Sequence, residues 1–439
     1  MIVPRNRLIF WVAVLLPFAA AGPMIPEAGI PAIALLSCFA LAAVVDAALL
    51  YGQLKGVRIS LPDVVRISKD RHGAIPVRIQ NDQNRVGSLR LGLPLPPEVG
   101  SDSDDLWVTL PAESELSSLA WPCTPVKRGN YAIHRCYIAA PSPLGLWELR
   151  ASVPAPAEIR VYPNLLKERN SLAAFFLKRG NFGAHAQRMV GKGRDFEKLR
   201  EYIPGDGYDE IHWKATAKRG IPVTKIFQIE RTQEVYVAID SSRLSAKQHG
   251  PETALERFIS SALVLGIAAE QQGDLFGVLS FSDKVDAFVR ASGGKSHYNA
   301  CRDALYTIHP RRVTPSFDDL CSFIRLRLRR RSLLVILTDL NDPVLSENFI
   351  RNIDLIARQH LVVVYMIQPP GAAALFGRDR AQSSDDLYQK LAGHILWHNL
   401  RELDKVLQRR GVKLTQVSQE RMSADIVSQY IRIKQRQLL

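Results

Sequence analysis

The pattern of hydrophobic and polar positions divides the chain into regions of different period. Two long apolar runs come first, Leu8–Ile25 and Gly29–Tyr51, and the second contains a single charge, Asp46. Each run is about long enough to cross the ~30 Å hydrocarbon core of a bilayer. Residues 1–55 are therefore predicted to form a transmembrane helical hairpin.

Basic residues flank this pair of runs. Arg5 and Arg7 precede the first run, and Lys55 and Arg58 follow the second. By the positive-inside rule both ends of the hairpin face the cytoplasm, and so does everything after it. A cleavable signal peptide would show a similar first run. The hairpin is favoured because the second run follows almost at once, with its cations on the far side.

Asp46 is costly inside lipid, so it marks either a helix–helix contact or a functional site, or it lies near the membrane surface. We favour the position near the surface.

Residues 56–165 alternate polar and apolar positions with a period of two. Short runs such as Ile75–Gln80, Leu89–Leu93 and Leu146–Arg150 are separated by Gly, Pro, Asn and Asp clusters. This pattern predicts an all-β sandwich of the immunoglobulin or fibronectin kind, with roughly seven strands. The region contains no catalytic constellation, and its expected job is spacing or binding.

Residues 233–439 alternate apolar strands with amphipathic helices, which predicts a doubly wound parallel α/β domain. Binding sites in such domains lie at the carboxyl ends of the strands. Asp240 and Asp339 follow two predicted strands at that position. The alternative is that both aspartates cap the helices that follow. The predicted strands are 235–239, 275–280, 285–289, 332–337, 361–367 and 412–417, and the predicted helices are 252–271, 298–308, 317–330 and a long stretch from 386.

Composition narrows the class of partner but not its identity. The chain has 57 Lys and Arg against 43 Asp and Glu, a net charge of +14 that favours anionic partners. Arg325, Arg327 and Arg329–Arg331 form a basic cluster, interpreted as a solvated helix end that can approach an anionic membrane. No interleaved aromatics surround it, so no nucleic acid is expected. The five cysteines form no CxxC pair, which argues against a disulfide framework or a zinc site.

Residues 166–232 lack a clean helix or strand period and interleave charged, aromatic and turn residues. This segment contains the run Gly191-x-Gly193-x-Asp195-Phe196-x-x-Leu199-Arg200-x-Tyr202-x-Pro204-Gly205-Asp206, followed by Ile211-x-Trp213-Lys214. This text resembles the signature of the domain-of-unknown-function family 58, G-x-G-x-(D/E)-F-x-x-L-R-x-Y-x-P-G-D followed by I-D-W-K-A-(S/T)-A-R. His212 stands where the family has Asp, and Lys218 replaces its Arg. The signature residues predicted to matter are Asp195, Phe196, Arg200, Tyr202, Pro204, Gly205, Asp206, Trp213 and Lys214.

The role expected for this signature segment is structural. Arg200, Glu201, Asp206, Lys214 and Glu230 can form a buried ion network, with Trp213 and Tyr202 as apolar lids. Buried charges are usually paired for structural reasons. The rival interpretation is an active site around Asp195 and Arg200.

A second resemblance concerns the carboxyl edge of the α/β domain. Asp240–Leu244 resembles the D-x-S-x-S loop of von Willebrand factor A domains, in which oxygen ligands hold Mg²⁺. The resemblance implies a weak Mg²⁺ site at Asp240, Ser242, Ser296 and Asp339. Leu244 occupies a ligand position and cannot ligate, so the site is expected to be degenerate.

Two functions are compatible with these features. The first is a non-enzymatic, membrane-anchored protein-interaction module; the family resemblance adds a MoxR-type AAA+ ATPase as partner in assembling or remodelling complexes, at a prokaryotic inner membrane. The alternative is a hydrolase or metal-dependent phosphoryl-handling enzyme that uses Asp195, Asp206, Asp240 and His212. The alternative is less favoured because no nucleophile, base and orienting residue form a set.

Overall fold

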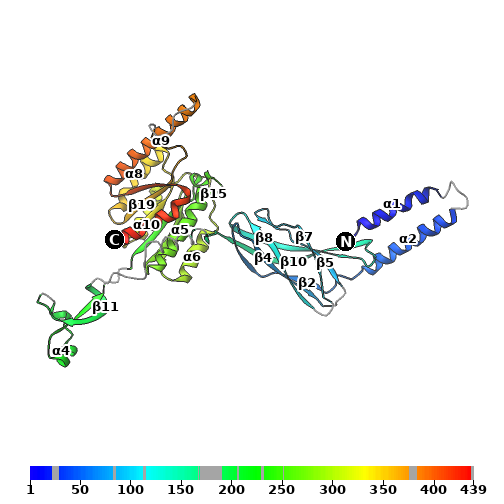
Figure 1. Cartoon of the computed structure of the whole chain (residues 1–439), viewed down its shortest axis with the longest axis horizontal. Coiled ribbons are helices and arrows are strands. Elements are labelled where there is room, and N and C mark those ends of the chain that lie inside the picture. The colour runs from blue at the N-terminus through cyan, green and yellow to red at the C-terminus, as the bar shows by residue number, and fades with distance from the viewer. Residues whose placement is uncertain are drawn as a thin grey trace. The chain divides into compact units, whose positions relative to one another are not determined.

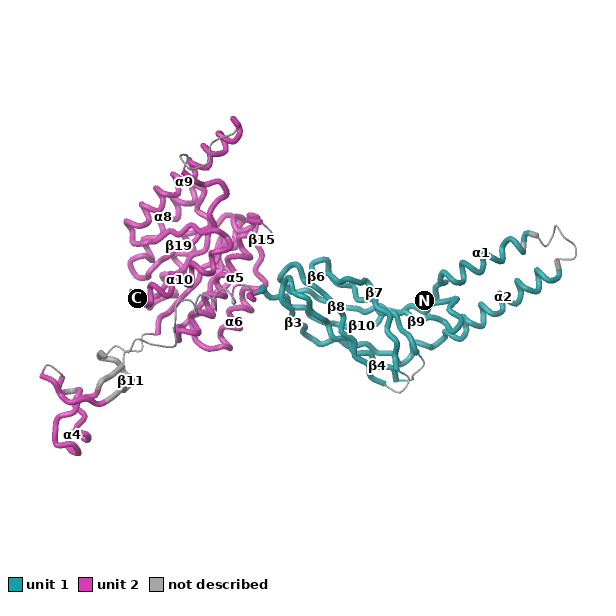
Figure 2. Tube along the Cα trace, viewed as in Figure 1, with its two compact units in different colours: residues 1–164 teal, residues 165–439 magenta. Residues whose placement is uncertain are grey.

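The structure is a computed structural model that describes residues 1–21, 29–82, 86–111, 115–166, 168, 190–204, 207–228, 232–250, 252–374 and 383–436. The chain divides into two compact units, Met1–Asn164 and Leu165–Leu439 (Figure 2). The first unit contains two apolar helices and a β domain. The second contains an α/β domain and a small lobe.

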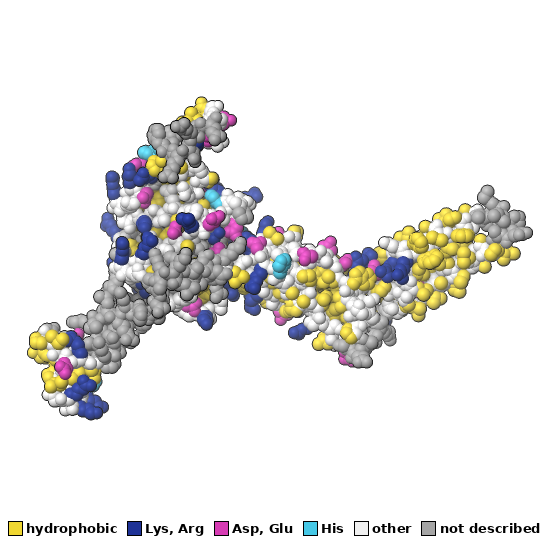
Figure 3. All heavy atoms as spheres, viewed as in Figure 1, with side chains coloured by type: hydrophobic (Ala, Val, Ile, Leu, Met, Phe, Trp, Pro, Cys, Tyr) yellow, Lys and Arg dark blue, Asp and Glu magenta, His cyan; other side chains and the backbone are white. Residues whose placement is uncertain are grey.

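Helices α1 (Asn6–Ala21) and α2 (Gly29–Leu49) form the apolar part of the first unit. Hydrophobic side chains cover their surface (Figure 3). Among the described residues, one helix is long and apolar enough to cross a membrane, Ile30–Leu49, and only 6% of its most apolar window is buried. Such exposure is unlike that of a core helix. Within the described residues the apolar part of α1, Asn6–Phe18, is shorter than this, so of the two predicted runs the second meets the length criterion.

The β domain consists of two sheets that enclose one core. One sheet has the order β1-β10-β9-β5-β7, with β3 beside β10, and the other has the order β2-β4-β8-β6. Inward-facing residues of both sheets form a single cluster, which includes Ile75 and Ile79 of β4, Ile159 of β10 and the buried Trp121. The strands are β1 (Ile2–Pro4), β2 (Val57–Ser60), β3 (Val64–Ser68), β4 (Gly73–Asn81), β5 (Ser88–Gly92), β6 (Val99–Gly100), β7 (Asp105–Thr109), β8 (Leu116–Pro125), β9 (Gly129–Pro141) and β10 (Trp147–Tyr162).

The turn between β9 and β10 joins the apolar helices to the β domain. The Asp46 side chain on α2 is fully buried and accepts hydrogen bonds from Ser142 Oγ (2.6 Å) and from the backbone N–H groups of Leu144 (3.0 Å) and Leu146 (3.3 Å). Trp147 Nε1 donates to the Ala43 carbonyl of the same helix at 2.8 Å. A buried carboxylate is tolerated because polar donors surround it. Asp46 therefore binds the β domain, a role that sequence reasoning did not consider.

The start of α1 is held at the same turn. Strand β1 pairs antiparallel with β10, with Ile2 opposite Leu149, and Arg5 N donates to the Leu146 carbonyl at 2.9 Å. The residues before α1 and the end of α2 thus contact the same part of the β domain.

The α/β domain is built on a six-stranded sheet of order β17-β16-β13-β18-β19-β20. All neighbouring pairs are parallel except β16 with the edge strand β17. Its strands are β13 (Glu234–Asp240), β16 (Leu275–Phe281), β17 (Val285–Ser292), β18 (Ser332–Leu337), β19 (Leu361–Ile367) and β20 (Lys413–Val417); a small hairpin, β14 (Gln248–His249) and β15 (Glu252–Thr253), precedes the first helix.

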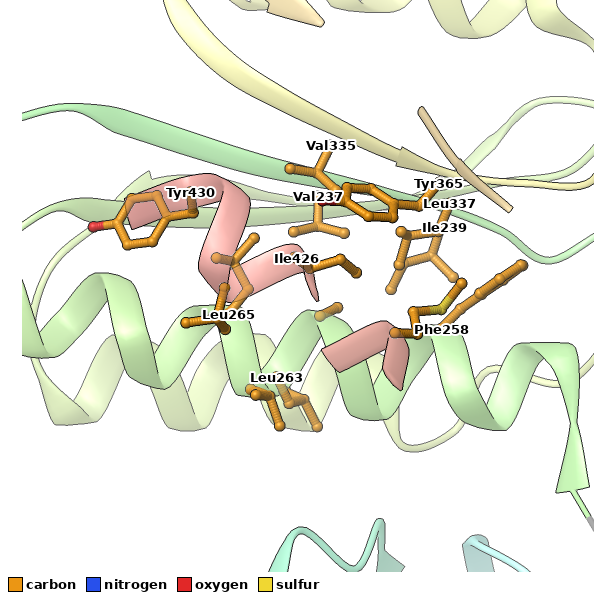
Figure 4. Packing of buried hydrophobic residues seen from close by; sticks show 14 of the residues in the cluster. Val237, Ile239, Phe258, Leu263, Leu265, Val335, Leu337, Tyr365, Ile426 and Tyr430 are labelled. Atoms are coloured by element: carbon orange, nitrogen blue, oxygen red, sulfur yellow. The ribbon is translucent and has the colours of Figure 1, made fainter. Parts of the chain in front are cut away.

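Helices pack on both faces of this sheet (Figure 1). Alternate residues of β13 belong to different cores: Val237 and Ile239 to one, and Tyr236 and Ala238 to the other. Figure 4 shows the first core, in which Phe258 of α5 and Ile426 of α10 approach the strands. The helices are α5 (Ala254–Gln271), α6 (Lys295–Leu305), α7 (Phe317–Arg327), α8 (Pro343–Ala357), α9 (Ser384–Arg409) and α10 (Met422–Gln435).

Several helices of this domain differ from the predictions, and α6 spans Lys295–Leu305 where 298–308 was predicted. Helix α7 ends at Arg327, three residues before the predicted end, because Leu328 leaves the helical conformation as its C-cap. Helices α8 and α10 were not among the predicted elements. A helix at α8 was detectable, since Asp342 caps it through the N–H groups of Val344 and Leu345 and Pro343 begins it.

The small lobe carries the signature segment. Strand β11 (Val190–Glu201) pairs antiparallel with β12 (Val223–Gln228), and a 3₁₀ turn η2 (Tyr208–Glu210) and helix α4 (Trp213–Arg219) lie between them in sequence. Gly220 ends α4 with a positive φ of 70°, a conformation that costs a glycine little.

Candidate functional site at the carboxyl edge of the sheet

The strand order reverses between β13 and β18, because β13 is followed by β16 on one side and β18 by β19 on the other. Crevices form at the carboxyl ends of strands at such a switch point. Asp240 ends β13, and Thr338 and Asp339 follow β18. The fold thus brings together the two aspartates that the sequence placed at strand ends.

Asp240 is completely buried, and each of its carboxylate oxygens accepts a hydrogen bond. Ser242 N donates to Oδ1 at 2.8 Å, and Thr338 Oγ1 donates to Oδ2 at 2.6 Å. Burial raises the pKa of the Asp240 carboxyl, and the hydrogen bonds from Ser242 and Thr338 oppose that rise. Thr338 is a site residue that sequence reasoning missed, although its position directly before Asp339 was a usable signal.

Ser242 supports the loop after β13. Its Oγ accepts from Leu244 N at 3.3 Å, and its carbonyl accepts from Ser245 Oγ at 2.8 Å. These bonds cap the short 3₁₀ helix η3 (Arg243–Ala246). The Ser242 oxygen thus accepts from its own loop, while its hydroxyl also hydrogen-bonds to the Asp240 carboxylate.

Asp339 is paired with a cation of the protein itself. Lys247 Nζ lies 2.6 Å from Asp339 Oδ2, and Asn341 N donates to Oδ1 at 2.9 Å. The Asp339 side chain is only 14% exposed, whereas that of Lys247 is 51% exposed. Lys247 is a second residue that the sequence did not indicate, because 92 positions separate it from its partner.

A second polar cluster lies beside the loop after β13. Arg311 Nη1 donates to Ser282 Oγ at 2.9 Å, to Asp283 Oδ1 at 2.9 Å and to Asp286 Oδ1 at 2.6 Å. The backbone N–H of Arg311 also donates to the Ser241 carbonyl at 2.7 Å. Hydrogen bonding by Ser282, together with the charge of Arg311, lowers the pKa of Asp283. Arg311 is thus an ion-pair partner of both carboxylates of this cluster.

The structure contradicts the assignment of Ser296 to the metal site. Strand β17 is antiparallel to β16, so its end returns to the amino edge of the sheet, where Ser292 pairs with Phe276. Helix α6 starts there, and His297 bonds the Phe276 carbonyl at 2.8 Å. Asp240, by contrast, pairs with Phe281 at the other end of β16. Ser296 and Asp240 therefore lie at opposite edges of the sheet.

The alternative, that Asp240 and Asp339 cap the next helices, is also wrong. Ser242 is the N-cap of η3 and Asp342 is the N-cap of α8. Both aspartates instead accept from the backbone N–H two residues further along, as in an Asx turn.

Asp240, Ser242 and Asp339 offer the oxygen ligands that a hard cation needs. The carboxylate oxygens, however, already accept hydrogen bonds from other groups of the protein. A Mg²⁺ ion at Asp339 would have to displace the Lys247 ammonium. Within the described residues, no group of three or more His, Cys, Asp and Glu side chains is arranged to hold a metal ion.

Cysteine is a poor nucleophile in the α/β domain. Burial raises the pKa of both Cys301 and Cys321 to about 12, so both thiols are protonated at neutral pH.

The signature lobe differs from its predicted form. Trp213 is 68% exposed and Lys214 is exposed, so Trp213 is no apolar lid over a buried ion network. Arg200 is half-buried, Pro204 is exposed, and the Tyr202 ring stacks on Tyr208 at 6.3 Å between centroids. Asp195 and Phe196 lie in β11 opposite Gln228 and Phe227. Gly205, Asp206 and Glu230 lie outside the described residues.

His212, which stands where the signature that this segment resembles has Asp, caps helix α4. Its Nδ1 accepts a hydrogen bond from Ala215 N at 3.0 Å and so caps α4. Aspartate is a favoured N-cap for the same reason, because its side chain accepts from the first helical N–H groups. The hydrogen bond of His212 is made with Ala215, and those of Asp240 are made with Ser242 and Thr338. None of these bonds joins His212 to Asp240, two residues that the alternative enzyme function would combine.

Comparison with known proteins gives a family match for part of the chain. Residues 198–380 match the model of a family described as protein of unknown function DUF58. The match includes most of the signature lobe and the larger part of the α/β domain. None of the curated proteins matches the chain.

Several solved structures resemble the chain weakly. The conserved hypothetical protein BatB from Bacteroides thetaiotaomicron is 16% identical, with a TM-score of 0.29 over 45% of this chain and 98% of that one. An aerotolerance-related membrane protein from Bacteroides fragilis is 16% identical, with a TM-score of 0.31 over 46% and 98%. An uncharacterized membrane spanning protein from Vibrio fischeri is 12% identical, with a TM-score of 0.17 over 46% and 99%. Similarity this low assigns the chain neither a fold nor an activity.

Proposed function

We propose that this protein is a non-enzymatic, membrane-anchored protein-interaction module. The observation that carries the proposal is the state of the polar groups at the carboxyl edge: the carboxylates of Asp240 and Asp339 are bonded to donors of the protein itself. A catalytic site needs a nucleophile and a base placed for substrate. This edge offers instead an ordered polar surface on a rigid sheet.

We further propose that the α/β domain is a doubly wound domain of the von Willebrand factor A kind. Its parallel strands, the helices on both faces and the two aspartates at the switch point support this class. The DUF58 match over residues 198–380 includes the strands that carry both aspartates.

The anchor is proposed to be a helical hairpin in a prokaryotic inner membrane, with the β and α/β domains in the cytoplasm. The apolar helix Ile30–Leu49 supports a span. The contacts of Arg5 and Asp46 with one turn of the β domain support a return of the chain to the side on which it began. Reporter fusions at the C-terminus that give signal only outside the cytoplasm would contradict this topology.

A MoxR-type AAA+ ATPase is the partner that the family resemblance implies, and the carboxyl edge is its proposed docking surface. The test is binding of the detergent-solubilised full chain to the purified ATPase, followed by calorimetry. Asp339→Ala should weaken binding at least several-fold, whereas the control Glu347→Ala, on the exposed face of α8, should not. Equal affinities for both variants would exclude this surface.

Weak Mg²⁺ binding at Asp240, Ser242 and Asp339 is a separate proposal, strengthened when a partner carboxylate completes the shell. If it holds, chelation should lower the affinity for the partner as much as Asp339→Ala does. Binding that survives both chelation and the substitution would show that recognition uses another surface.

A further inference from the structure

The amino edge of the α/β sheet carries a concentrated positive charge in the segment Arg325–Arg331, here called the arginine turn. It comprises the end of α7 and the connection to β18, and it contains five arginines, all exposed. Its two leucines differ: Leu328 is 2% exposed, whereas Leu326 is 75% exposed.

Helix polarity explains only part of this charge. Helices that run opposite to parallel strands place their C-terminal ends at the amino edge, where the helix dipole favours cations. Arg325 and Arg327 lie in the last turn of α7. Arg329, Arg330 and Arg331 lie beyond the C-cap, so the dipole of α7 does not account for them.

Among the described residues, ion pairs with carboxylates leave at least two arginines of the turn unmatched. Arg330 lies 3.8 Å from Glu234, and Arg327 stacks over the Phe323 ring at 5.9 Å. In the part of the chain that the structure describes, no carboxylate lies within 4.0 Å of Arg325 or Arg329. The contrast with the carboxyl edge is direct, because Arg311 and Lys247 there are paired with aspartates.

The backbone of the turn is fixed in place. Gln359 Nε2 donates to the carbonyls of Leu328 and Arg329, both at 3.1 Å. Leu328 N donates to the Ile324 carbonyl at 2.8 Å, and the Leu328 side chain is buried in the second core. The arginines therefore extend from a pre-ordered frame, which lowers the entropic cost of binding an anionic surface.

We propose that the arginine turn binds the surface of an anionic phospholipid bilayer, with the guanidinium groups on lipid phosphates and Leu326 inserted among the acyl chains near the headgroups. Clustered Lys and Arg beside an exposed apolar side chain are the composition of peripheral membrane contacts. The inference rests on the membrane anchoring proposed above, because the apolar helix Ile30–Leu49 keeps the domain close to a bilayer and raises its effective concentration there.

Lipid is favoured over nucleic acid by the side chains around the turn. Single-stranded nucleic acid is bound on open aromatic rings, whereas Phe323, two residues before the turn, is half-buried and has Arg327 over its ring. An exposed leucine between two arginines instead suits an interface with an apolar interior.

The test places a fluorescent probe at the turn in the full-length chain. Cys38 is the exposed native cysteine and is first replaced by Ser; the other four cysteines are buried. Leu326→Cys then carries an environment-sensitive fluorophore, and the protein is reconstituted into nanodiscs of phosphatidylcholine with or without phosphatidylglycerol. The matched control is Val344→Cys, at a position that is 74% exposed at the start of α8, at the other edge of the same domain.

We expect a blue shift and protection from an aqueous quencher at position 326 only in discs that contain phosphatidylglycerol. Raised salt, or the triple variant Arg325→Gln, Arg329→Gln, Arg330→Gln, should abolish both effects, and the probe at 344 should not respond. The triple variant is checked for unchanged thermal unfolding, which its exposed positions predict.

Three outcomes would overturn the proposal: no response at 326 in anionic discs, an equal response in neutral discs, or equal responses at 326 and 344. A stronger response to an added oligonucleotide than to phosphatidylglycerol would assign the turn to nucleic acid. Failure of the chain to enter discs at all would contradict the membrane anchoring instead, and is therefore distinguishable.

Discussion

Asp46 and Asp240 are both fully buried aspartates, yet they serve different parts of the molecule. Asp46 accepts hydrogen bonds from a turn about a hundred residues away and so joins an apolar helix to the β domain. Asp240 accepts from its own loop and from the neighbouring strand end. Burial of a carboxylate is therefore no sign of a binding site by itself; the origin of its donors decides what it does.

The largest expected effect is at Asp46. Asp46→Ala should lower the free energy of unfolding of the first unit by about 3–5 kcal/mol, because two backbone N–H groups and a hydroxyl lose a charged acceptor. Denaturant unfolding in detergent measures the change. Ser142→Ala removes one of the three donors and should cost clearly less; equal losses would show that the carboxylate is not the centre of the joint.

A smaller effect is expected at Asp240. Asp240→Ala leaves Ser242 N and the Thr338 hydroxyl without their acceptor, at a cost of about 1–3 kcal/mol to the α/β domain. Asp240→Asn keeps an acceptor oxygen for one donor and should cost less. Thermal unfolding compares the two. If Asp240→Asn lowers the stability as much as Asp240→Ala does, the negative charge of Asp240 matters more than its hydrogen bonds.

The pH dependence of stability tests whether burial of Asp240 outweighs its hydrogen bonds in setting its pKa. Because the pKa of Asp240 is raised in the folded state, folding takes up a proton between the unfolded and folded pKa values. Ionisation of Asp240 therefore opposes folding at neutral pH, and this opposition fades as pH falls through the folded pKa. The stability of wild type relative to Asp240→Asn should rise on acidification from about pH 7 to about pH 4. A constant difference across that range would mean that Asp240 has an ordinary pKa.

The smallest effect is expected at Lys247. The Lys247 side chain is half exposed in its ion pair with Asp339. Lys247→Met should therefore lower the free energy of unfolding by only about 0–1 kcal/mol. The same variant should increase stabilisation by Mg²⁺, since Asp339 loses its internal cation. Arg351→Met, which breaks the exposed pair with Glu347, is the control and should leave the Mg²⁺ response unchanged. A Mg²⁺ response that Lys247→Met does not change would separate the metal proposal from Asp339.

Local pattern was sufficient for most of the α/β domain. The run Ser332–Leu337 is strand β18 as predicted, and Leu361–Ile367 is β19, because continuous apolar runs of strand length suit a sheet covered on both faces. The placement of Asp240 and Asp339 at one edge followed from the same reasoning. Ser296 did not, because the antiparallel direction of β17 reversed the edge at which the next helix begins.

In the signature lobe, by contrast, the local sequence pattern did not predict which side chains are buried. A dense set of charged and aromatic residues indicated a buried network, but Trp213 is exposed and His212 acts as a local helix cap. Composition cannot distinguish an interior from an exterior aromatic when no period is present.

The sequence by itself determined the apolar helices, the two kinds of sheet and the aspartates at the strand ends, since these depend on periods of a few residues. Only the tertiary structure decided which groups those aspartates meet. Ser142 with Asp46, Thr338 with Asp240 and Lys247 with Asp339 are each separated by more than ninety positions. Such pairs arise from the packing of distant elements, and a single sequence carries no local signal of which distant donor will satisfy a buried carboxylate.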